Sequence, residues 1–146
     1  MKKPMILTAV MATGVALVLT FGPTLRLEAD SGAGQALYGA NCAECHGANL
    51  QGEPNWRQPN QDGTYPAPPH DESGHTWHHD DAYLFAYTKF GGAAVLAQMG
   101  ITNVSSAMPS FADSLSDDDI KAVLDYIEST WPARIREARK ARLSGG

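Results

Sequence analysis

The most regular pattern of apolar and polar positions lies near the end of the chain, in LSDDDIKAVLDYIESTWP. Its apolar residues recur at three- and four-residue intervals, at Ile120, Val123, Leu124 and Ile127. That spacing predicts an amphipathic helix whose apolar stripe packs into the core. Ser116, with Asp119 three residues later, predicts a capping box at the start of this helix, although aspartate is one carbon shorter than the usual glutamate.

Shorter helical patterns precede this one. The stretch DDAYLFAYTKFGG begins with acidic residues, is apolar from residue 84 to residue 87, and stops at Gly91. The following GGAAVLAQM is apolar as well, so we expect Met99 at its end to lie in the core. Upstream, Leu37 and Tyr38 lead into a short helix through NCAECH. No pair of strands is evident, and the chain therefore predicts an all-α fold.

A long irregular stretch, residues 52–81, separates these helical patterns. It reads GEPNWRQPNQDGTYPAPPHDESGHTWHHDD and is too rich in proline for regular structure. The whole chain holds 14 Gly and 9 Pro in 146 residues, so much of it must be loop. A small, loop-rich domain buries little apolar surface and usually depends on a disulfide, a metal or a cofactor.

The beginning of the chain has the pattern of an export signal. Two lysines precede an uncharged apolar run at residues 5–21, and acidic residues follow it. We expect residues 1–29 to be a cleaved signal peptide or a retained membrane anchor, with possible membrane association through residues 5–21. Residues 30–131 then form one domain, and residues 132–146 a basic, helical C-terminal tail.

Charge is unevenly distributed along the chain, whose formal net charge is −5. Between residues 30 and 131 the only bases are Arg57, Lys89 and Lys121, against many acidic residues. Such an acidic body excludes nucleic acid as a partner. The bases reappear in RIREARKAR near the C-terminus, which we interpret as a solvated helix face. The alternative is contact with an anionic membrane or an acidic protein patch.

The two cysteines of the chain, Cys42 and Cys45, lie three positions apart, and His46 follows directly. A zinc site would need two further ligands, for which only histidines remain. A thioredoxin-like pair would need a βαβ context, and a disulfide this short closes almost no loop. Covalent haem c gives each residue a role: two thiols one helical turn apart bond the vinyl groups, and His46 binds the iron from the proximal side.

The chain resembles the class I mono-haem c-type cytochromes over residues 34–131. The resemblance rests on LYGANCAECHG, on AMPSF around Met108, and on LSDDDIKAVLDYIESTWP. It implies a small all-α cytochrome c fold, wrapped around one covalently attached haem with a long Pro-rich loop. It also implies that the last helix crosses the first, with Tyr126 and either Leu37 or Tyr38 filling the crossing.

Met108 is the expected second axial ligand of the iron. Pro109 pushes Met108 into an extended conformation on a stiff loop, from which a thioether can point at a metal. The resemblance also places its methionine ligand here, downstream of the haem motif and before the last helix. Iron held by His46 and Met108 has no open position. A histidine of the long loop in place of Met108 is the alternative.

The long loop also holds candidate haem contacts. Propionates need hydrogen-bond donors and the haem edge needs aromatic cover, so we expect Trp56, Arg57 and Trp77 to contribute, with Tyr65 as a further candidate. Surface packing of the loop is the alternative for each. The imidazole of His46 should donate its other N–H to a backbone carbonyl, which the resemblance assigns to a proline. Four prolines compete for this role: Pro54, Pro59, Pro66 and Pro68.

The remaining histidines lie in the same loop, at His70, His75, His78 and His79. The spacing in HTWHH could suit a copper or zinc ion. We favour hydrogen bonds to nearby carboxylates and to the start of the following helix, because no cysteine or methionine stands beside these histidines.

These features predict an electron carrier and not an enzyme. It would pass single electrons between redox proteins in the periplasm, free or anchored to the membrane. A haem sensor or small peroxidase would need an open distal position, and a metal-handling protein would use His75, His78 and His79. Because few lysines surround the haem motif in sequence, we expect the partner to offer a basic or largely apolar face.

Overall fold

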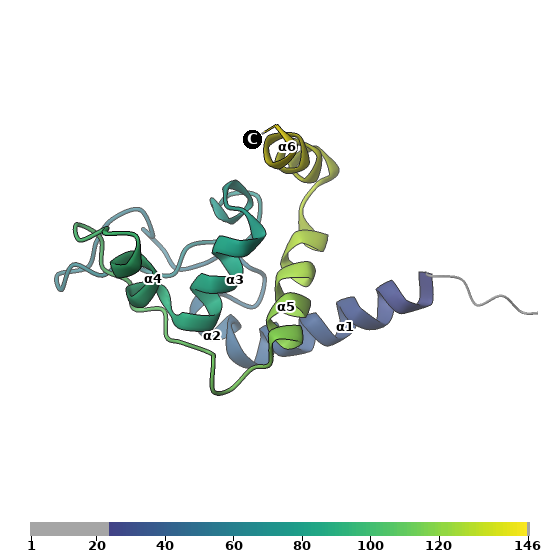
Figure 1. The fold of residues 1–146 in the computed structure, drawn as a ribbon, viewed down its shortest axis with the longest axis horizontal. Coiled ribbons are helices and arrows are strands. Elements are labelled where there is room, and N and C mark those ends of the chain that lie inside the picture. Colours follow the sequence, from purple (N-terminus) through teal and green to yellow (C-terminus); the bar gives the residue numbers. More distant parts are fainter. Residues whose placement is uncertain (1–23, 146) are drawn as a thin grey trace, which may run out of the picture.

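The computed structural model describes residues 24–145, which form the helical body shown in Figure 1. The elements are α1 (Thr24–Asn41), α2 (Ala43–His46), η1 (a 3₁₀ turn, Thr76–His78), α3 (Asp81–Phe90), α4 (Gly92–Gln98), α5 (Asp117–Thr130) and α6 (Ala133–Ser144). The one β-pairing among these residues is an isolated parallel bridge between Thr64 and Ser105. The predicted all-α class is therefore confirmed.

Of the predicted leader, residues 1–29, the structure describes only residues 24–29. The apolar run at residues 5–21 lies outside the described residues. Of the helices in residues 24–145, none combines the length and the apolar character that crossing a bilayer requires.

Helices α1 and α5 cross at close range, and much of the core lies at this crossing (Figure 1). Gly34 permits the approach, because a Cβ atom added there would lie 2.1 Å from the carbonyl oxygen of Ala122. Tyr38 is 1% exposed, and its ring centroid lies 5.6 Å from that of Tyr126. The crossing implied by the resemblance is thus present, and Tyr38 is its fully buried aromatic residue.

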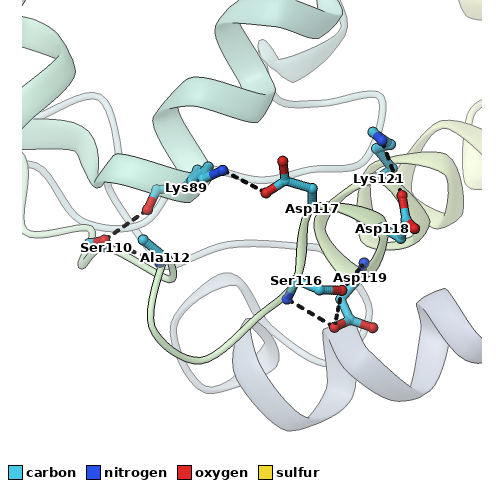
Figure 2. Close-up of polar contacts among 8 residues, drawn as sticks. All are labelled: Lys89, Ser110, Ala112, Ser116, Asp117, Asp118, Asp119 and Lys121. Carbon is cyan, nitrogen blue, oxygen red and sulfur yellow. Dashed lines mark hydrogen bonds and ion pairs between the residues drawn. The ribbon is translucent and has the colours of Figure 1, made fainter.

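The apolar stripe of α5 faces the core as its spacing predicted. Ile120, Val123 and Ile127 are buried and Leu124 is half-buried. At the start of the helix, the Ser116 hydroxyl accepts a hydrogen bond from the Asp119 N–H, and the Asp119 carboxylate accepts one from the Ser116 N–H (Figure 2). The predicted capping box is confirmed, and it sets the first turn of α5.

Helix α3 begins and ends where its sequence signals lie. The Asp80 side chain caps it by accepting from the Tyr83 N–H at 2.7 Å, and the chain leaves the helix at Gly91 with a φ of 83°. Lys89 in its last turn forms a 2.6 Å ion pair with Asp117 of α5 (Figure 2). This contact ties the end of α3 to the start of α5.

The prediction that Met99 lies in the core is wrong, since Met99 is 55% exposed. Helix α4 has only seven residues, and Val95 and Leu96 are the two large apolar side chains that it buries. Met99 stands just past the last helical residue, where the chain turns at Gly100. The helical period therefore no longer directs its side chain inward.

The basic C-terminal segment forms α6, which packs on the η1 turn and does not present all its bases to solvent. The Arg139 side chain is 5% exposed and pairs with Asp81 at 2.5 Å and Glu128 at 3.0 Å. Arg142 donates to the carbonyl of Trp77 at 2.7 Å. The interpretation as a solvated face therefore describes only part of this helix, because acidic and carbonyl groups of the chain itself engage it.

Candidate functional site

The two cysteines lie one helical turn apart, at the start of α2 and within it. Cys42 is the residue that precedes α2, and its carbonyl accepts hydrogen bonds from the N–H groups of Cys45 at 3.2 Å and His46 at 2.9 Å. No disulfide joins them; Cys42 is half-buried and Cys45 is exposed. Burial, reinforced by the neighbouring Cys45, raises the pKa of the Cys42 thiol to about 11. A redox pair uses a lowered thiol pKa, so this arrangement does not favour that chemistry.

His46 is buried, and one of its two ring nitrogens has a partner. Its Nδ1 atom lies 2.8 Å from the carbonyl oxygen of Pro68, which can only accept a hydrogen bond. Nδ1 therefore carries the proton, and Nε2 is left with a free lone pair for a metal. Burial lowers the pKa of His46, with the Pro68 hydrogen bond acting in the opposite direction. The neutral imidazole is the form that binds iron.

Of the four prolines that could accept a hydrogen bond from His46, Pro68 is therefore the one that does so. The loop reaches this position through several backbone hydrogen bonds: the Gly52 N–H donates to the His46 carbonyl at 2.8 Å, and the Glu53 N–H to the Ala67 carbonyl at 2.8 Å. Gly52 has a φ of 66°, and a Cβ atom there would lie 2.5 Å from the nitrogen of Pro69. A glycine is needed at this point, where the two sides of the loop meet.

Met108 lies half-buried on an irregular segment whose backbone is hydrogen-bonded to the junction of α3 and α4. Its carbonyl accepts from the Gly92 N–H at 3.1 Å. Two residues on, the Ser110 hydroxyl donates to the Lys89 carbonyl at 2.7 Å (Figure 2). The approach is close, because a Cβ atom at Gly92 would lie 2.1 Å from the Ser106 hydroxyl oxygen. Two hydrogen bonds therefore attach the segment that carries Met108 to the junction of α3 and α4, and the role of Met108 as a ligand stays a prediction.

One stretch of the long loop, residues 64–68, contacts the surroundings of both predicted ligands. At its end, Pro68 accepts the hydrogen bond from His46. At its beginning, Thr64 forms the parallel bridge with Ser105, three residues before Met108. The loop therefore connects the histidine side of the site to the methionine side.

Trp77 contains an orphaned donor. Its indole N–H is buried and has no hydrogen-bond partner among the described residues. The ring stacks on His78 with centroids 3.7 Å apart, and it packs against the core cluster that includes Tyr38. A buried donor without an acceptor is costly. A haem propionate is an acceptor of the kind that this N–H lacks, so Trp77 fits the expected cofactor.

Trp56 and Arg57 form a cluster within the loop. The Arg57 guanidinium lies 4.0 Å from the centroid of the Trp56 ring and donates to the Ser73 carbonyl at 3.5 Å. The other partner of Trp56 is His75, whose ring stacks on it with centroids 5.2 Å apart. Tyr65 is 39% exposed. The contacts of Trp56 and Arg57 are thus contacts of the loop with itself, and their predicted haem role stays a prediction.

The loop histidines are engaged with aromatic rings. His75 stacks on Trp56, His78 on Trp77 and His79 on Tyr83. Within residues 24–145, no group of three or more His, Cys, Asp or Glu side chains is placed to hold a metal ion. Burial lowers the pKa of His75 and His79, with a neighbouring histidine acting in the same direction, so both are neutral near pH 7.

His70 has a position that the sequence did not indicate. Its ring stacks on the ring of His46, with centroids 4.0 Å apart and an interplanar angle of 23°. Burial lowers the pKa of His70 well below its usual range, and the adjacent His46 acts in the same direction. Sequence spacing carries no signal for this pairing, because the two residues are 24 positions apart and the chain between them is irregular.

Comparisons with known proteins point to one family. The family model for cytochrome c matches residues 31–131, which include both cysteines, His46 and Met108. The chain is also similar to the chloroplastic cytochrome c6 of Chlamydomonas reinhardtii, with 28% identity over 121 residues, or 83% of this chain and 68% of that protein. No solved structure gives a significant match.

Proposed function

Because the chain belongs to the cytochrome c family, we propose that it shuttles single electrons between redox proteins outside the cytoplasm, with His46 and Met108 as axial ligands. Members of this family carry electrons and hold haem c covalently, so the chain is an electron carrier rather than an enzyme. The axial ligand pair, the compartment and the partners are the parts that we propose.

The residues of the site divide the work of holding the haem. When bound, haem c supplies an iron atom that accepts and releases one electron. Cys42 and Cys45 would attach it from one helical turn, and the Nε2 atom of His46 would be available to the iron because Pro68 engages Nδ1. The indole N–H of Trp77, which has no partner in the described part of the chain, would be available to a propionate. The thioether of Met108 would serve as the second axial ligand, and a His/Met pair raises the reduction potential and leaves no site for oxygen.

The observation that carries the proposal is the double contact of residues 64–68. Pro68 accepts a hydrogen bond from His46, and Thr64 pairs with Ser105, three residues before Met108. A single stretch of chain therefore contacts His46 and the segment that leads to Met108. This supports a site in which both ligands would stay in place when the iron changes oxidation state, as fast one-electron transfer requires.

Met108 and Met99 offer a matched pair of variants for testing the ligand. The protein is made in a host that matures c-type haem, and the oxidised absorption spectrum is recorded. We expect a low-spin spectrum with the weak far-red band of methionine-bound ferric iron. Met108→Ala should abolish that band, and Met99→Ala should leave it unchanged because Met99 is exposed beyond α4. Retention of the band in Met108→Ala would contradict the proposed ligand.

The compartment rests on the sequence of the leader and on the chemistry of the cofactor. C-type haem is attached outside the cytoplasm, and the chain begins with a charged start and an apolar run. Fractionation of cells expressing the full chain should recover it with the periplasm or with the membrane. Recovery of haem-loaded protein in the cytoplasmic fraction would contradict this part of the proposal.

The partner is a redox protein with a basic or largely apolar docking face. Residues 30–131 contain fourteen Asp and Glu but only three Lys and Arg. The five bases of α6 offset only part of this charge, and one of them, Arg139, forms ion pairs with Asp81 and Glu128. Electron transfer to a basic acceptor should therefore slow as salt is added, and transfer to an acidic acceptor should speed up.

A further inference from the structure

The ring of His70 lies directly on the ring of His46. The two centroids are 4.0 Å apart and the planes are inclined by 23°, which is stacking contact. His46 is also held by Pro68 through Nδ1. A single hydrogen bond fixes the position of that nitrogen but leaves the imidazole plane free to tilt about it. A second, flat neighbour removes this freedom.

His70 is itself held from three directions. Its Nδ1 atom lies 2.8 Å from the hydroxyl oxygen of Thr76, which is 5% exposed. Its backbone N–H donates to the Leu50 carbonyl at 2.8 Å. Its carbonyl accepts from the indole N–H of Trp131 at 2.7 Å, and Trp131 is 2% exposed. The imidazole that stacks on His46 is therefore an anchored surface and not a mobile side chain.

His75 in the same loop provides the contrast. It also stacks on an aromatic ring, that of Trp56, but with centroids 5.2 Å apart, and the residue is more exposed to solvent than His70. Its backbone carbonyl accepts only a local hydrogen bond from His78. Stacking on an aromatic ring is thus common to the loop histidines. His70 differs because buried residues hold it in place and because the ring that it stacks on is that of the predicted iron ligand, His46.

We propose that His70 is a positioning residue that sets the plane of the His46 imidazole. The inference rests on the proposed function, because it assumes that His46 binds the iron. The orientation of an axial imidazole plane determines how the iron d orbitals split, so it appears in the ferric g values and in the spread of the haem methyl resonances. Positioning by His70 would make both properties depend on a residue that never touches the iron.

The test compares three variants of the haem-loaded protein: His70→Leu, His70→Phe and His75→Leu. Ferric electron paramagnetic resonance and proton NMR report the g values and the haem methyl shifts. His70→Leu removes the flat neighbour, and we expect a shift of the largest g value and a changed spread of methyl resonances. His70→Phe retains a flat ring and should stay close to the wild type. His75→Leu should not differ from the wild type.

Thr76→Val keeps the ring of His70 but removes its hydrogen-bond partner. It should shift the g values in the same direction as His70→Leu and by less, and it supplies the test if His70→Leu does not fold. Unchanged g values in Thr76→Val and His70→Leu, or equal shifts in His70→Leu and His70→Phe, would overturn the positioning role. A wild-type protein that is not low-spin would instead contradict the proposed ligation, so the two failures are distinguishable.

Discussion

The crossing of α1 and α5 is held in one way, and the irregular segment between α2 and α3, residues 47–80, which contains the long loop, is held in another. The crossing is formed by buried apolar and aromatic side chains such as Tyr38 and Val123, packed where Gly34 lets two helix backbones approach. The loop has few such side chains. Hydrogen bonds to individual carbonyl groups hold it instead, among them those of Pro68, Leu50 and His70.

This difference corresponds to two tasks at the haem site. The crossing fixes the end of α1, and with it the turn that carries Cys42, Cys45 and His46. The loop then determines which nitrogen of His46 is free and connects to the segment of Met108. The hydrophobic effect has no preferred direction, whereas a hydrogen bond weakens steeply when its geometry changes. We therefore expect damage to the crossing to cost stability, and damage to the loop to alter ligation as well.

Breaking the crossing should have the largest effect. Gly34→Val places side-chain atoms where a Cβ alone would lie 2.1 Å from the Ala122 carbonyl oxygen. Because that neighbour is backbone, α1 and α5 must separate, and we expect a loss of about 3 kcal/mol or more in the free energy of unfolding. Denaturant unfolding of the haem-loaded protein measures this.

Gly39→Ala on the same helix is the matched control. Nothing lies within 4 Å of a Cβ atom at Gly39, and its backbone is helical. Alanine should therefore stabilise the protein by about 0.5–1 kcal/mol. A loss in Gly39→Ala as large as that in Gly34→Val would show that close approach is not what makes Gly34 important.

One link between the two regions is the hydrogen bond from Trp131 to the His70 carbonyl. Trp131→Phe keeps a buried ring at the end of α5 but leaves that carbonyl without its indole donor. We expect a loss of about 2 kcal/mol, because an unsatisfied buried acceptor retains its full desolvation cost. Amide hydrogen exchange should show faster opening around residue 70 than within α5. Equal acceleration in both places would contradict the separation of crossing and loop.

Removing the contact between α6 and the start of α3 should have a smaller effect. Arg139→Met keeps the buried volume but removes the ion pairs with Asp81 and Glu128. The Asp81 side chain is 82% exposed and can be solvated, so we expect a loss of about 1 kcal/mol rather than that of a stranded buried charge. The control Arg134→Met breaks an exposed pair with Glu72 and should change stability by less than about 0.5 kcal/mol. Thermal unfolding of both variants measures the two losses, and a loss in Arg134→Met as large as that in Arg139→Met would contradict this prediction.

The capping box offers the smallest effect, and one that depends on pH. Hydrogen bonds from the Ser116 hydroxyl and backbone lower the pKa of Asp119. A lowered pKa means that this interaction stabilises the folded state above the usual aspartate value, about 3.9, and that the contribution is lost as the pH falls through the folded pKa. Ser116→Ala should therefore lower the unfolding midpoint near pH 7, and its difference from the wild type should narrow in acid.

Ser129→Ala, at the other end of α5, is the control for the capping box. The Ser129 hydroxyl donates only to the carbonyl of Tyr126 in its own turn. This variant should leave the pH dependence of stability unchanged. A difference between Ser116→Ala and the wild type that stays constant from pH 7 into acid would contradict the role given to Asp119.

The sequence could predict features that depend on neighbouring residues, but not those that depend on the path of the loop. The capping box, the stripe of α5 and the haem motif depend on residues within one or two turns of each other, so local spacing was sufficient. The partner of His46 could not be chosen, because Pro54, Pro59, Pro66 and Pro68 are chemically alike. Which one reaches the imidazole depends on the path of the loop, which hydrogen bonds such as Gly52 to His46 determine.

Two further cases show where spacing misleads or is silent. Met99 continues the apolar pattern of the preceding residues. However, α4 ends at Gln98 and the chain turns there, so the apolar pattern extends one residue beyond the helix and Met99 is exposed. The stacking of His70 on His46 joins residues from an irregular loop and a helical turn. No periodicity relates them, and only the folded loop brings the two rings together.

The most direct test of the account is to add carbon monoxide to the reduced wild-type protein and record the absorption spectrum. If His46 and Met108 occupy both axial positions, the low-spin reduced spectrum should not change on mixing. An immediate shift, from a spectrum that is high-spin beforehand, would show an open distal position. That result would contradict the electron-carrier account and would favour a haem sensor or a small peroxidase.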